Sequence, residues 1–457
     1  MNRRLARIGA IALTIAIAPA LAHAQTPLTL QGAVAYALSH DPTVAAKYAA
    51  VTAQAHAVAV QEGQTFPTVS AMAQSILQKQ EHYGGAYQLI GIAPQANFSQ
   101  NTVSIGISNY SLNSGGLGFL QLASANASLA AAREDLARSE DLVAANVTNA
   151  FYSVAQKKGI VALDASDLGY QDALLSAARI KAREGATAGV DVLRARVAQA
   201  KSASTLVAAR ADVQNAYEQL AHTIGAPLDT AFAVPAAIPE PALPKGAIDV
   251  LENIATAERP DVISARKTLL AARETRKGWD RELFPSLQIQ ASLGNQYSPT
   301  ESALFQAFSK TPIPRGSPGF WQIGVTTTFT LPLVDYGQRH TERVNDDAQI
   351  AADERALANV VSQAQLDVRQ QYRAAQTALA QLAYAKEEAR LGLEAARIAQ
   401  LQYRNGVIAL ADVIQAQQTS VQAQTDLVDA RVAYVEAVVA LRVAVGTYSP
   451  ESAVADL

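Results

Sequence analysis

Two aspartates occupy the same place in a motif that occurs twice in the chain. Asp191 follows Gly185 by six residues, Asp412 follows Gly406 by six residues, and each aspartate begins an Asp-Val-(Leu/Ile)-x-Ala sequence. A glycine can end a helix in the left-handed conformation. A carboxylate in the first turn of the next helix is stabilised by the helix dipole. The motif therefore predicts that one helix ends at each glycine and that an anion lies at the start of the helix that follows.

The residue types that carry catalysis show no comparable arrangement. The sequence contains no G-x-S-x-G, P-loop or H-E-x-x-H motif, and GGLGFL at 115–120 lacks the third glycine of a dinucleotide fingerprint. There is no cysteine, the histidines are scattered without ligand spacing, and Met72 is the one methionine after Met1. These absences argue against an enzyme, a cofactor or a resident soft metal.

Residues 1–24 have the pattern of a secretory signal peptide. Three arginines precede the apolar run IGAIALTIAIAPALA, and an A-x-A cleavage site ends at Ala24. Gln25 follows instead of cysteine, so no lipid anchor is expected on the mature chain. A retained N-terminal anchor is the alternative.

The net charge argues against a nucleic-acid partner, and the hydropathy argues against a transmembrane helix. The whole chain has a formal charge of −3, and removing the three arginines of the signal peptide makes it −6. Nucleic-acid binding needs a basic face, so nucleic acid is not an expected partner. No later segment approaches 18 consecutive apolar residues, so no transmembrane helix is expected.

The sequence is internally duplicated. Gly225 matches Gly446 at the offset of 221 residues that separates Gly185 from Gly406, and Phe66-Pro67 matches Phe284-Pro285 at an offset of 218. Ordered matches of this kind indicate two copies of one unit. The predicted organisation is a signal peptide (1–24), a first repeat (25–226), a Pro-rich linker (227–244), a second repeat (245–446) and a C-terminal tail (447–457). Each repeat is expected to contain a helix, two strands and a long helical hairpin.

Long helices are predicted in both repeats. Residues 95–226 and 333–449 contain no proline, and apolar side chains recur at steps of three and four. From Gly337 to Gly406 a continuous helix would be about 100 Å long at roughly 1.5 Å per residue. The predicted apolar stripe, which skips only Lys386, consists of Leu357, Val361, Ala364, Val368, Tyr372, Ala375, Leu379, Leu382, Ala389, Leu393 and Ala396.

Four segments alternate with a period of two and are predicted to be strands. They lie at 68–76, 103–108, 287–294 and 321–331, and their polar positions carry Ser, Thr, Gln and Gly rather than charges. Long loops are expected over 77–102 and 296–320. Uncharged polar faces and strands of this length suit a membrane barrel with a water-filled lumen. A half-buried soluble sheet is the alternative.

Four strands cannot close a barrel by themselves. An unpaired strand edge in lipid costs several kcal/mol for each bare backbone group, and membrane barrels begin at about eight strands. The chain must therefore oligomerise if its strands span a membrane. A dimer would supply eight strands and a trimer twelve, and both satisfy this requirement.

In combination, these features resemble the outer-membrane efflux protein (TolC-like) family over essentially the whole mature chain. The signs are the duplication, the Phe-Pro before each first strand, the strand-to-helix turn LVDYG with Asp335 and Gly337, and the Y-x-x-G-x₅-D-V motif that begins at Tyr403. The first copy departs from the family at the corresponding turn, LNSGG, which ends at Gly116 and has Ser114 in place of the aspartate.

The resemblance implies a mostly α protein with β structure, in which duplicated long-helix hairpins accompany four membrane strands per chain. A homotrimer would form a 12-stranded β-barrel continuous with an α-helical barrel, in contact with outer-membrane lipid. It implies an exit duct that exports small molecules such as drugs and toxic compounds, in a tripartite pump with a periplasmic adaptor and an inner-membrane transporter. A type I protein-secretion duct and a pore-less periplasmic coiled-coil scaffold are the alternatives.

The resemblance also assigns roles to the repeated motif. The glycines would mark the periplasmic tips of the hairpins. Asp412 would face the lumen at the closed end, Tyr403 would help to hold that end shut, and Asp191 is the matching aspartate of the first repeat. The family's second aspartate and its basic residue are replaced here by Gln415 and Ile408, so the resemblance predicts a single acidic tier and a weak ionic latch.

The hairpin tips are the predicted docking surface for the adaptor. Both tips carry small or apolar residues where solvated turns usually carry polar ones. A simple exposed turn is the alternative for the same segment. The candidate docking residues are Gly185, Ala186, Thr187, Gly406, Val407 and Ile408.

Overall fold

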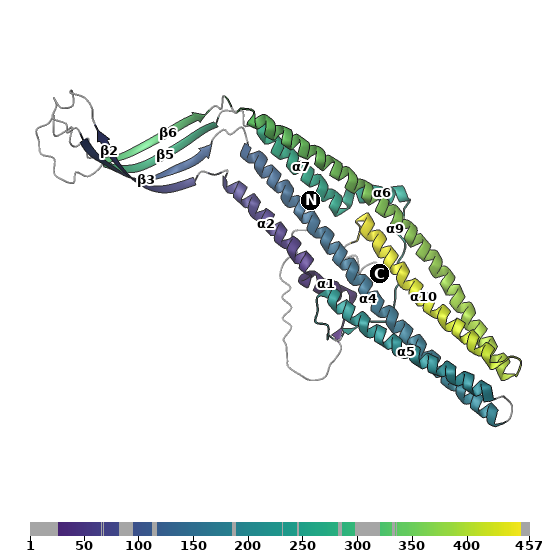
Figure 1. Cartoon of the computed structure of the whole chain (residues 1–457). Helices are drawn as coiled ribbons and strands as arrows, with labels where there is room; N and C mark the ends of the chain where they lie inside the picture. The colour runs from purple at the N-terminus through teal and green to yellow at the C-terminus, as the bar shows by residue number, and fades with distance from the viewer. Residues whose placement is uncertain are drawn as a thin grey trace, which may run out of the picture.

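The computed structural model describes residues 26–64, 66, 68–81, 95–111, 117–184, 189–230, 232–244, 246–281, 286–297, 320–330, 334 and 336–448. The described chain is long and mostly helical, with a sheet at one end and the far ends of two pairs of antiparallel helices at the other (Figure 1). The predicted signal peptide and several predicted site residues lie outside the described residues: Gly116, Gly185, Ala186, Thr187 and Asp335.

The elements follow one another in a repeated order. The first half contains β1 (Thr26–Pro27), α1 (Leu30–His40), α2 (Pro42–Gln64), β2 (Thr68–Glu81), β3 (Gln95–Ser111), α4 (Leu117–Arg183) and α5 (Gly189–Ile224). The second half contains β4 (Phe232–Ala233), α6 (Ile248–Glu258), α7 (Pro260–Arg281), β5 (Ser286–Tyr297), β6 (Phe320–Thr330), α9 (Gln338–Arg404) and α10 (Leu410–Val445).

The four longer strands form one antiparallel sheet in the order β2-β3-β5-β6. Its register aligns apolar positions of all four strands in one row and polar positions in the next. One row contains Ala71, Ile105, Leu293 and Ile323, and the adjacent row contains Ser70, Gly106, Ser292 and Gly324. Alternating rows place one residue class on each face of the sheet. All four predicted strands are therefore present, and the register between β3 and β5 shifts once, between Ile107 and Tyr110.

The strands extend farther than their sequence pattern indicates. β2 continues to Glu81 and β3 begins at Gln95, and these two residues pair, although the sequence predicts a loop over 77–102. β5 likewise ends at Tyr297, just inside the loop predicted over 296–320. Residues 78–81 are all polar, so no alternation marks them as strand. Ladder hydrogen bonds need no such alternation, and pairing continues beyond it.

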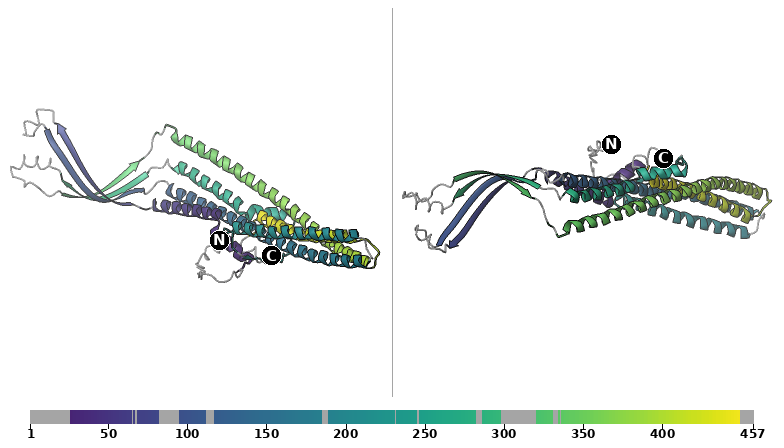
Figure 2. Two further views of the ribbon diagram at one scale, coloured as in Figure 1. Left: turned by 60° about the horizontal axis from the view of Figure 1, so that its bottom comes forward. Right: turned by 90° about the horizontal axis from the view of Figure 1, so that it is seen from above.

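The two repeats contain helices of equal length. α4 and α9 each have 67 residues, and α5 and α10 each have 36. Each long helix runs from the sheet to the far end, and the shorter helix returns beside it (Figures 1 and 2). The hairpin lengths thus set the distance between the sheet and the two turns.

Two helices precede the strands in each repeat, where the sequence analysis predicts one. α1 is followed by α2 and α6 by α7, and Pro42 and Pro260 are the first residues of the second helices. A proline cannot continue a preceding helix because its ring clashes with the earlier turn. The residue before each proline is extended, with φ −69° and ψ 125° at Asp41 and φ −65° and ψ 126° at Arg259. In each repeat, the break between the two helices is caused by the proline that begins the second helix.

Alanine dominates the buried face of α9. Its buried residues recur at steps of three, four or seven: Ala364, Val368, Ala375, Ala378, Leu382, Ala385, Ala389, Ala396, Ala399 and Tyr403. Six of these belong to the predicted stripe. Two predicted members, Leu379 and Leu393, are instead 42% and 51% exposed. Small side chains bring helix axes close together, and neighbouring alanines occupy the contact in place of these leucines.

A glycine ends each returning helix against the break between the two preceding helices. Gly225 has φ +74°, and a Cβ there would lie 3.3 Å from the Cβ of His40. Gly446 has φ +80°, and a Cβ there would lie 2.8 Å from the Cα of Arg259. His40 and Arg259 both adjoin the helix break in their repeat. The same close approach therefore joins the ends of each repeat unit, and it is tighter in the second.

Arg259 is the buried charged group of this second junction. Its residue is 4% exposed, and its guanidinium forms ion pairs of 2.9 Å with both Asp261 and Asp367. It also donates to the carbonyl oxygen of Ala444 at 3.4 Å, next to the close approach at Gly446. Two carboxylates and a carbonyl satisfy the buried charge, as burial requires. The junction thereby links α7, α9 and α10.

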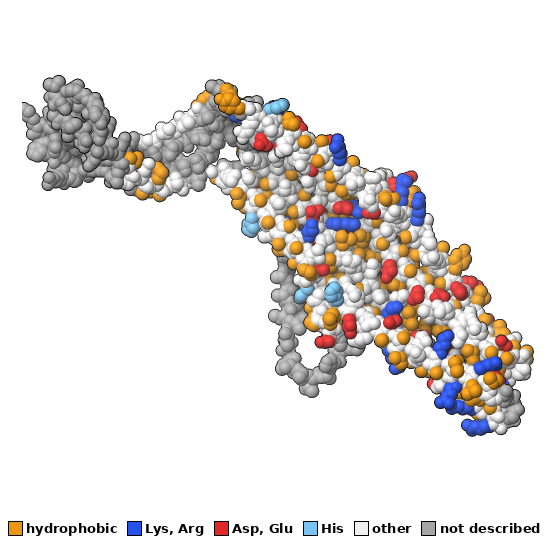
Figure 3. Space-filling view, viewed as in Figure 1, with side chains coloured by type: hydrophobic (Ala, Val, Ile, Leu, Met, Phe, Trp, Pro, Cys, Tyr) orange, Lys and Arg blue, Asp and Glu red, His pale blue; other side chains and the backbone are white. Residues whose placement is uncertain are grey.

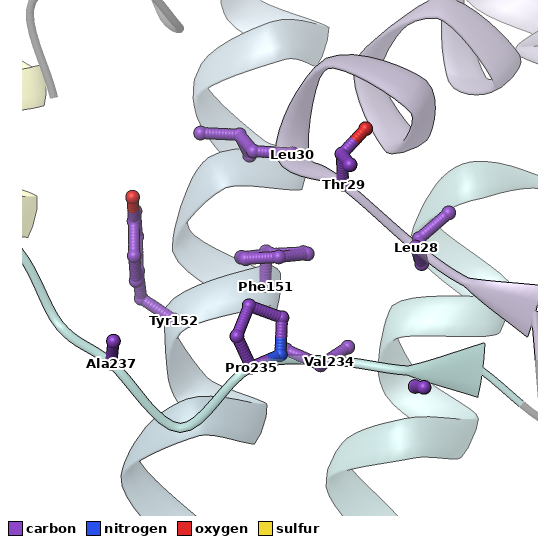
Figure 4. Close-up of a pocket in the computed structure, with 9 residues that line it drawn as sticks. Leu28, Thr29, Leu30, Phe151, Tyr152, Val234, Pro235 and Ala237 are labelled. Atoms are coloured by element: carbon purple, nitrogen blue, oxygen red, sulfur yellow. The ribbon is translucent and has the colours of Figure 1, made fainter.

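The Pro-rich linker packs along the helices. β4 pairs in parallel with β1 at the start of the described chain. Lys158 Nζ donates to the carbonyl oxygen of Val234 at 2.5 Å, and Tyr434 Oη donates to that of Pro241 at 2.8 Å. An apolar cavity of about 520 Å³ lies beside this crossing, with Phe151 between the N-terminal segment and the linker (Figure 4). These contacts attach the linker to both hairpins.

The described part of the C-terminal tail also belongs to the core. Tyr448 is 1% exposed, and its hydroxyl lies 2.8 Å from that of Thr148 on α4. Burial raises the pKa of Tyr448 to about 12. Across the described residues, no helix contains a stretch that is both long and apolar enough to traverse a bilayer.

We expect Gly446→Ala to destabilise the protein more than Gly337→Ala. Both glycines have positive φ, +80° and +86°, but nothing lies within 4 Å of a Cβ at Gly337. Each substitution incurs the roughly 1–2 kcal/mol that a left-handed conformation costs an L-residue. Gly446→Ala adds an overpacking cost of about 1–3 kcal/mol.

Thermal unfolding in detergent, followed by circular dichroism at 222 nm, measures this difference. Equal losses of unfolding temperature for the two variants would show that the backbone at Arg259 moves to accommodate the methyl group.

Candidate functional site

The C-terminal ends of α4 and α9 and the starts of α5 and α10 lie close together at the end of the molecule farthest from the sheet (Figures 1 and 2). α9 ends at Arg404, and Gly406 takes the left-handed conformation with φ +76°. The N–H of Val407 then donates to the carbonyl oxygen of Gln402 at 2.9 Å, which closes the end of the helix. Glycine permits this geometry at little steric cost. The helix end predicted at Gly406 is confirmed.

A small apolar cluster joins the two hairpins just inside their turns. We call it the tip cluster, and its buried members are Leu174, Leu175, Ala178, Ala195, Tyr403, Leu410 and Val413. Tyr170, Val192, Ile408 and Ile414 pack against it and are partly buried. The members come from α4 and α5 in one hairpin and from α9 and α10 in the other. Separation of the hairpins would expose this cluster to water.

Tyr403 is the largest side chain of the tip cluster and is 6% exposed. Lys181 Nζ lies 4.1 Å from the centroid of its ring and donates to the Tyr403 carbonyl oxygen at 3.2 Å. Within the described residues, the Tyr403 hydroxyl has no hydrogen-bond partner. Burial, and secondarily the charge of Asp191, raises the pKa of this hydroxyl. Tyr403 therefore joins the hairpins through its ring and its backbone, and its hydroxyl remains neutral.

The two aspartates of the repeated motif lie in first turns, as predicted, but in different surroundings. Asp412 is exposed, and its Oδ2 accepts from the N–H of Ala409 at 3.3 Å. Asp191 is partly buried and forms an ion pair with Arg194 at 3.5 Å. Asp412 thus has no cationic partner among the described residues, whereas Asp191 is compensated within its own helix. Of the two carboxylates, Asp412 presents the less compensated charge.

The remaining predicted residues fall into three groups. Gln415 is exposed and lines a groove of about 370 Å³ between α5 and α10, together with Val190, Leu193, Arg194 and Val197 among others. Val407 is 70% exposed at the turn, whereas Ile408 packs against the tip cluster. Gly337 lies at the other end of α9, where it caps the helix with φ +86°.

Basic and hydrophobic side chains gather together around the hairpin end (Figure 3).

Lys181 and Arg194 are site residues that the sequence analysis does not identify. Lys181 is in the last turn of its helix, where a cation is favourable for dipole reasons alone. Arg194 is three residues from Asp191, a common spacing for a surface pair. The Arg194 spacing is that of an ordinary surface ion pair, so it does not indicate a site. The partner of Lys181 is Tyr403 in the other hairpin, and the local sequence around Lys181 contains no sign of that contact.

Solved outer-membrane channels have a similar fold. The Campylobacter jejuni CmeC outer membrane channel matches with a TM-score of 0.71 at 16% identity, covering 92% of this chain and 86% of that chain. The outer membrane protein VceC of Vibrio cholerae matches with a TM-score of 0.69 at 19% identity, covering 91% and 96%. The open state of the Neisseria gonorrhoeae MtrE outer membrane channel matches with a TM-score of 0.69 at 19% identity, covering 92% and 90%.

The sequence profile described as outer membrane efflux protein matches the chain twice, over residues 33–226 and 251–447. The chain belongs to the outer membrane efflux protein family. This membership places it among outer-membrane channels and not among enzymes. No curated protein sequence matches the chain.

We expect Tyr403→Phe to be nearly neutral and Tyr403→Ala to be strongly destabilising. Phenylalanine keeps the ring over which Lys181 lies and removes a buried hydroxyl that has no partner in the described structure. Alanine leaves a cavity in the tip cluster, at a cost of about 3–5 kcal/mol for a buried aromatic side chain.

Limited proteolysis at the hairpin turns, together with thermal unfolding, measures the effect. The Phe variant serves as the control for the Ala variant. A Phe variant as protease-sensitive as the Ala variant would show that the hydroxyl, and not the ring, holds the hairpins together.

Proposed function

We propose that three copies of this chain form an outer-membrane exit duct, with a 12-stranded β-barrel continuous with an α-helical barrel. The supporting observation is a sheet with two open edges. Within the described residues, β2 and β6 each pair along one side only. Unpaired edges are untenable in lipid, and three four-stranded sheets joined edge to edge supply the strands of a closed barrel.

The helices also expose apolar side chains that a single chain leaves uncovered. On α9 these are Leu366, Leu379, Tyr384, Leu391, Leu393, Ile398 and Leu401, and on α5 they are Val190, Leu193, Val197 and Val207. These exposed side chains are available for contact with neighbouring copies of the chain. Covering of these faces by neighbouring copies would close the helices into a tube, as the family resemblance implies.

The duct would export small molecules such as drugs and toxic compounds, in a tripartite pump with a periplasmic adaptor and an inner-membrane transporter. Family membership supports this role. The leader at 1–24 would be removed after Ala24 on the way to the outer membrane. The hairpin tips, including Gly406, Val407 and Ile408 with their counterparts Gly185, Ala186 and Thr187, would receive the adaptor.

Asp412 would form the acidic tier of the periplasmic gate. Its exposed carboxylate lacks a cationic partner among the described residues, and three copies around the axis would place an anionic ring at the constriction. Gln415 and Ile408 provide no second tier and no basic latch. Tyr403 would contribute by packing in the tip cluster, and Asp191 through its field on the Tyr403 hydroxyl.

Electron microscopy of the detergent-solubilised mature protein tests the assembly. End views with three-fold symmetry and a tube well over 100 Å long are expected, because the sheet extends beyond a 67-residue helix of roughly 1.5 Å per residue. Compact monomers, or two-stranded rods that form without detergent, would favour the pore-less scaffold instead.

Asp412→Asn is expected to relieve block of the channel by polyvalent cations in planar bilayers by at least tenfold in blocking concentration. The substitution removes one negative charge from each subunit at the constriction. Asp426→Asn is the control, since Asp426 lies on the same helix four turns away and accepts a hydrogen bond from Gln422. Unchanged block in Asp412→Asn, or equal relief in both variants, would refute the gate assignment.

Gly406→Arg is expected to abolish efflux, measured as the minimal inhibitory concentration of an exported compound, while leaving the amount of membrane-inserted trimer normal. The arginine would add bulk and charge at an exposed turn where a Cβ meets nothing within 4 Å. Gly406→Asn is the control, because asparagine tolerates the left-handed conformation. Loss of the trimer itself in Gly406→Arg would show that this glycine is needed for folding rather than for docking.

A further inference from the structure

The two hairpins have helices of equal length but differ in charge near their turns. In the first hairpin, formed by α4 and α5, residues 178–201 contain six basic and two acidic residues, a formal charge of +4. The matching residues of the second hairpin, 399–422 at the offset of 221, contain one basic and one acidic residue. The whole chain has a formal charge of −3, so the rest of it carries −7. Positive charge is therefore concentrated at the end of the first hairpin, where basic side chains gather (Figure 3).

Glutamine replaces nearly all of these cations in the second hairpin. At the offset of 221, Arg183 alone has a basic counterpart, Arg404. The helices of the two hairpins have the same lengths, so the fold of a hairpin does not require the other cations. Cations that only complement a helix dipole would be expected in both copies. The basic residues that are matched by glutamine are Arg179, Lys181, Arg194, Arg196 and Lys201, and their counterparts are Gln400, Gln402, Gln415, Gln417 and Gln422.

Four of the six cations form what we call the basic tip surface: Arg179 and Arg183 on α4, and Arg196 and Lys201 on α5. All four are exposed, and no ion pair within the described residues involves any of them. The remaining two cations make contacts inside the protein. The member farthest from the turn, Lys201, lies about 18 Å along α5 from Gly189. Four uncompensated charges thus occupy one short end of the hairpin.

Association of identical copies would not neutralise this charge. Glu184 in the first hairpin and Asp412 in the second are the exposed acidic residues of the two segments, and Asp191 already pairs with Arg194. Each copy adds a formal charge of +4 at the same end, whatever the number of copies in a parallel assembly. The positive charge therefore remains available to a different partner.

The side chains around the cations favour a protein as that partner. Ile180, next to Arg179, is 53% exposed, and Val407 at the turn of the other hairpin is 70% exposed. Arginine beside exposed apolar side chains is typical of protein interfaces. Three of the four cations are arginines, and a guanidinium binds a carboxylate through two parallel hydrogen bonds. The complementary surface is one that carries aspartate or glutamate together with apolar residues.

We propose that the basic tip surface binds an acidic segment of the periplasmic adaptor, and that the adaptor thereby distinguishes the first hairpin from the second. Carboxylates of the partner pair with the four cations, and its apolar side chains cover Ile180. The corresponding part of the second hairpin carries glutamines and offers no such charge pairing. The identity of the partner as the adaptor rests on the proposed duct function, whereas affinity for an acidic segment does not.

Fluorescence anisotropy with the full-length protein in detergent tests the binding. The probe is a fluorescein-labelled amphipathic peptide of leucine and glutamate, and the reference probe has glutamine in place of each glutamate. We expect the glutamate peptide to bind about tenfold more tightly at low salt, with the preference falling as NaCl screens the exposed charges. In the variant Arg179→Gln/Arg196→Gln/Lys201→Gln the preference is lost. Each substitution introduces the residue that the second hairpin has at the matching position, so the unfolding temperature is expected to be unchanged.

Arg210→Gln/Arg355→Gln/Arg373→Gln is the matched control. It removes three exposed arginines that lie about 30 Å or more along their helices from the turns, and it changes the net charge equally. Preference retained in this control and lost in the tip variant supports the surface. No preference in the wild-type protein, or equal loss in both variants, overturns it. Binding to phosphatidylglycerol vesicles that the tip variant loses, without binding of the glutamate peptide, would overturn the protein partner and assign the surface to lipid headgroups.

Transport separates this inference from the proposed duct function. The tip variant is expected to lose efflux, measured as the minimal inhibitory concentration of an exported compound, while its conductance in planar bilayers stays at the wild-type level. Normal efflux in the tip variant would refute the role of the basic tip surface and leave the duct function standing. A wild-type protein that binds the glutamate peptide but forms no conducting pore would refute the duct function and leave the binding surface intact.

Discussion

Close packing of very long helices through alanine is the interaction on which the rest of the structure depends. α9 extends from the sheet to the turns, and most of its buried contacts with neighbouring helices are made by alanine at steps of three, four or seven residues. Each alanine buries little area, so stability comes from repetition along 67 residues rather than from a large core. The sheet and the tip cluster, at opposite ends, keep their relative positions because this contact is continuous.

The long hairpins could be predicted from the sequence, but the exact buried face of α9 could not. Apolar residues at steps of three and four are compatible with several adjacent faces of α9. The predicted face was the one that contains the larger residues Leu379 and Leu393. Ala378 and Ala385 are buried instead, because a narrow gap between helices admits a methyl group more easily than an isobutyl group. The strands were predictable where residues alternate, and unpredictable where both faces are polar but backbone pairing continues to Glu81.

The candidate site likewise contains features that the sequence predicts and features that it does not. The left-handed Gly406 and the first-turn position of Asp412 follow from local rules, so the repeated motif predicts both. The contact between Lys181 and Tyr403 depends on how two hairpins align, and local spacing contains no information on that alignment. Sequence thus predicts what one helix end requires, and packing determines what two hairpins share.

The contact between the tips is mainly apolar, and this affects how the hairpins can separate. The pairing of Lys181 with Tyr403 uses the ring face and a carbonyl oxygen, and the tyrosine hydroxyl takes no part in a hydrogen bond in the described structure. With Ile408 and Gln415 in place of charged residues, the resistance to separation comes from burial of the tip cluster. Apolar burial is insensitive to ionic screening, unlike an exposed ion pair. A partner that covers the exposed cluster could therefore hold the hairpins apart without breaking a network of ion pairs, since its own apolar surface would replace the contact that the hairpins lose.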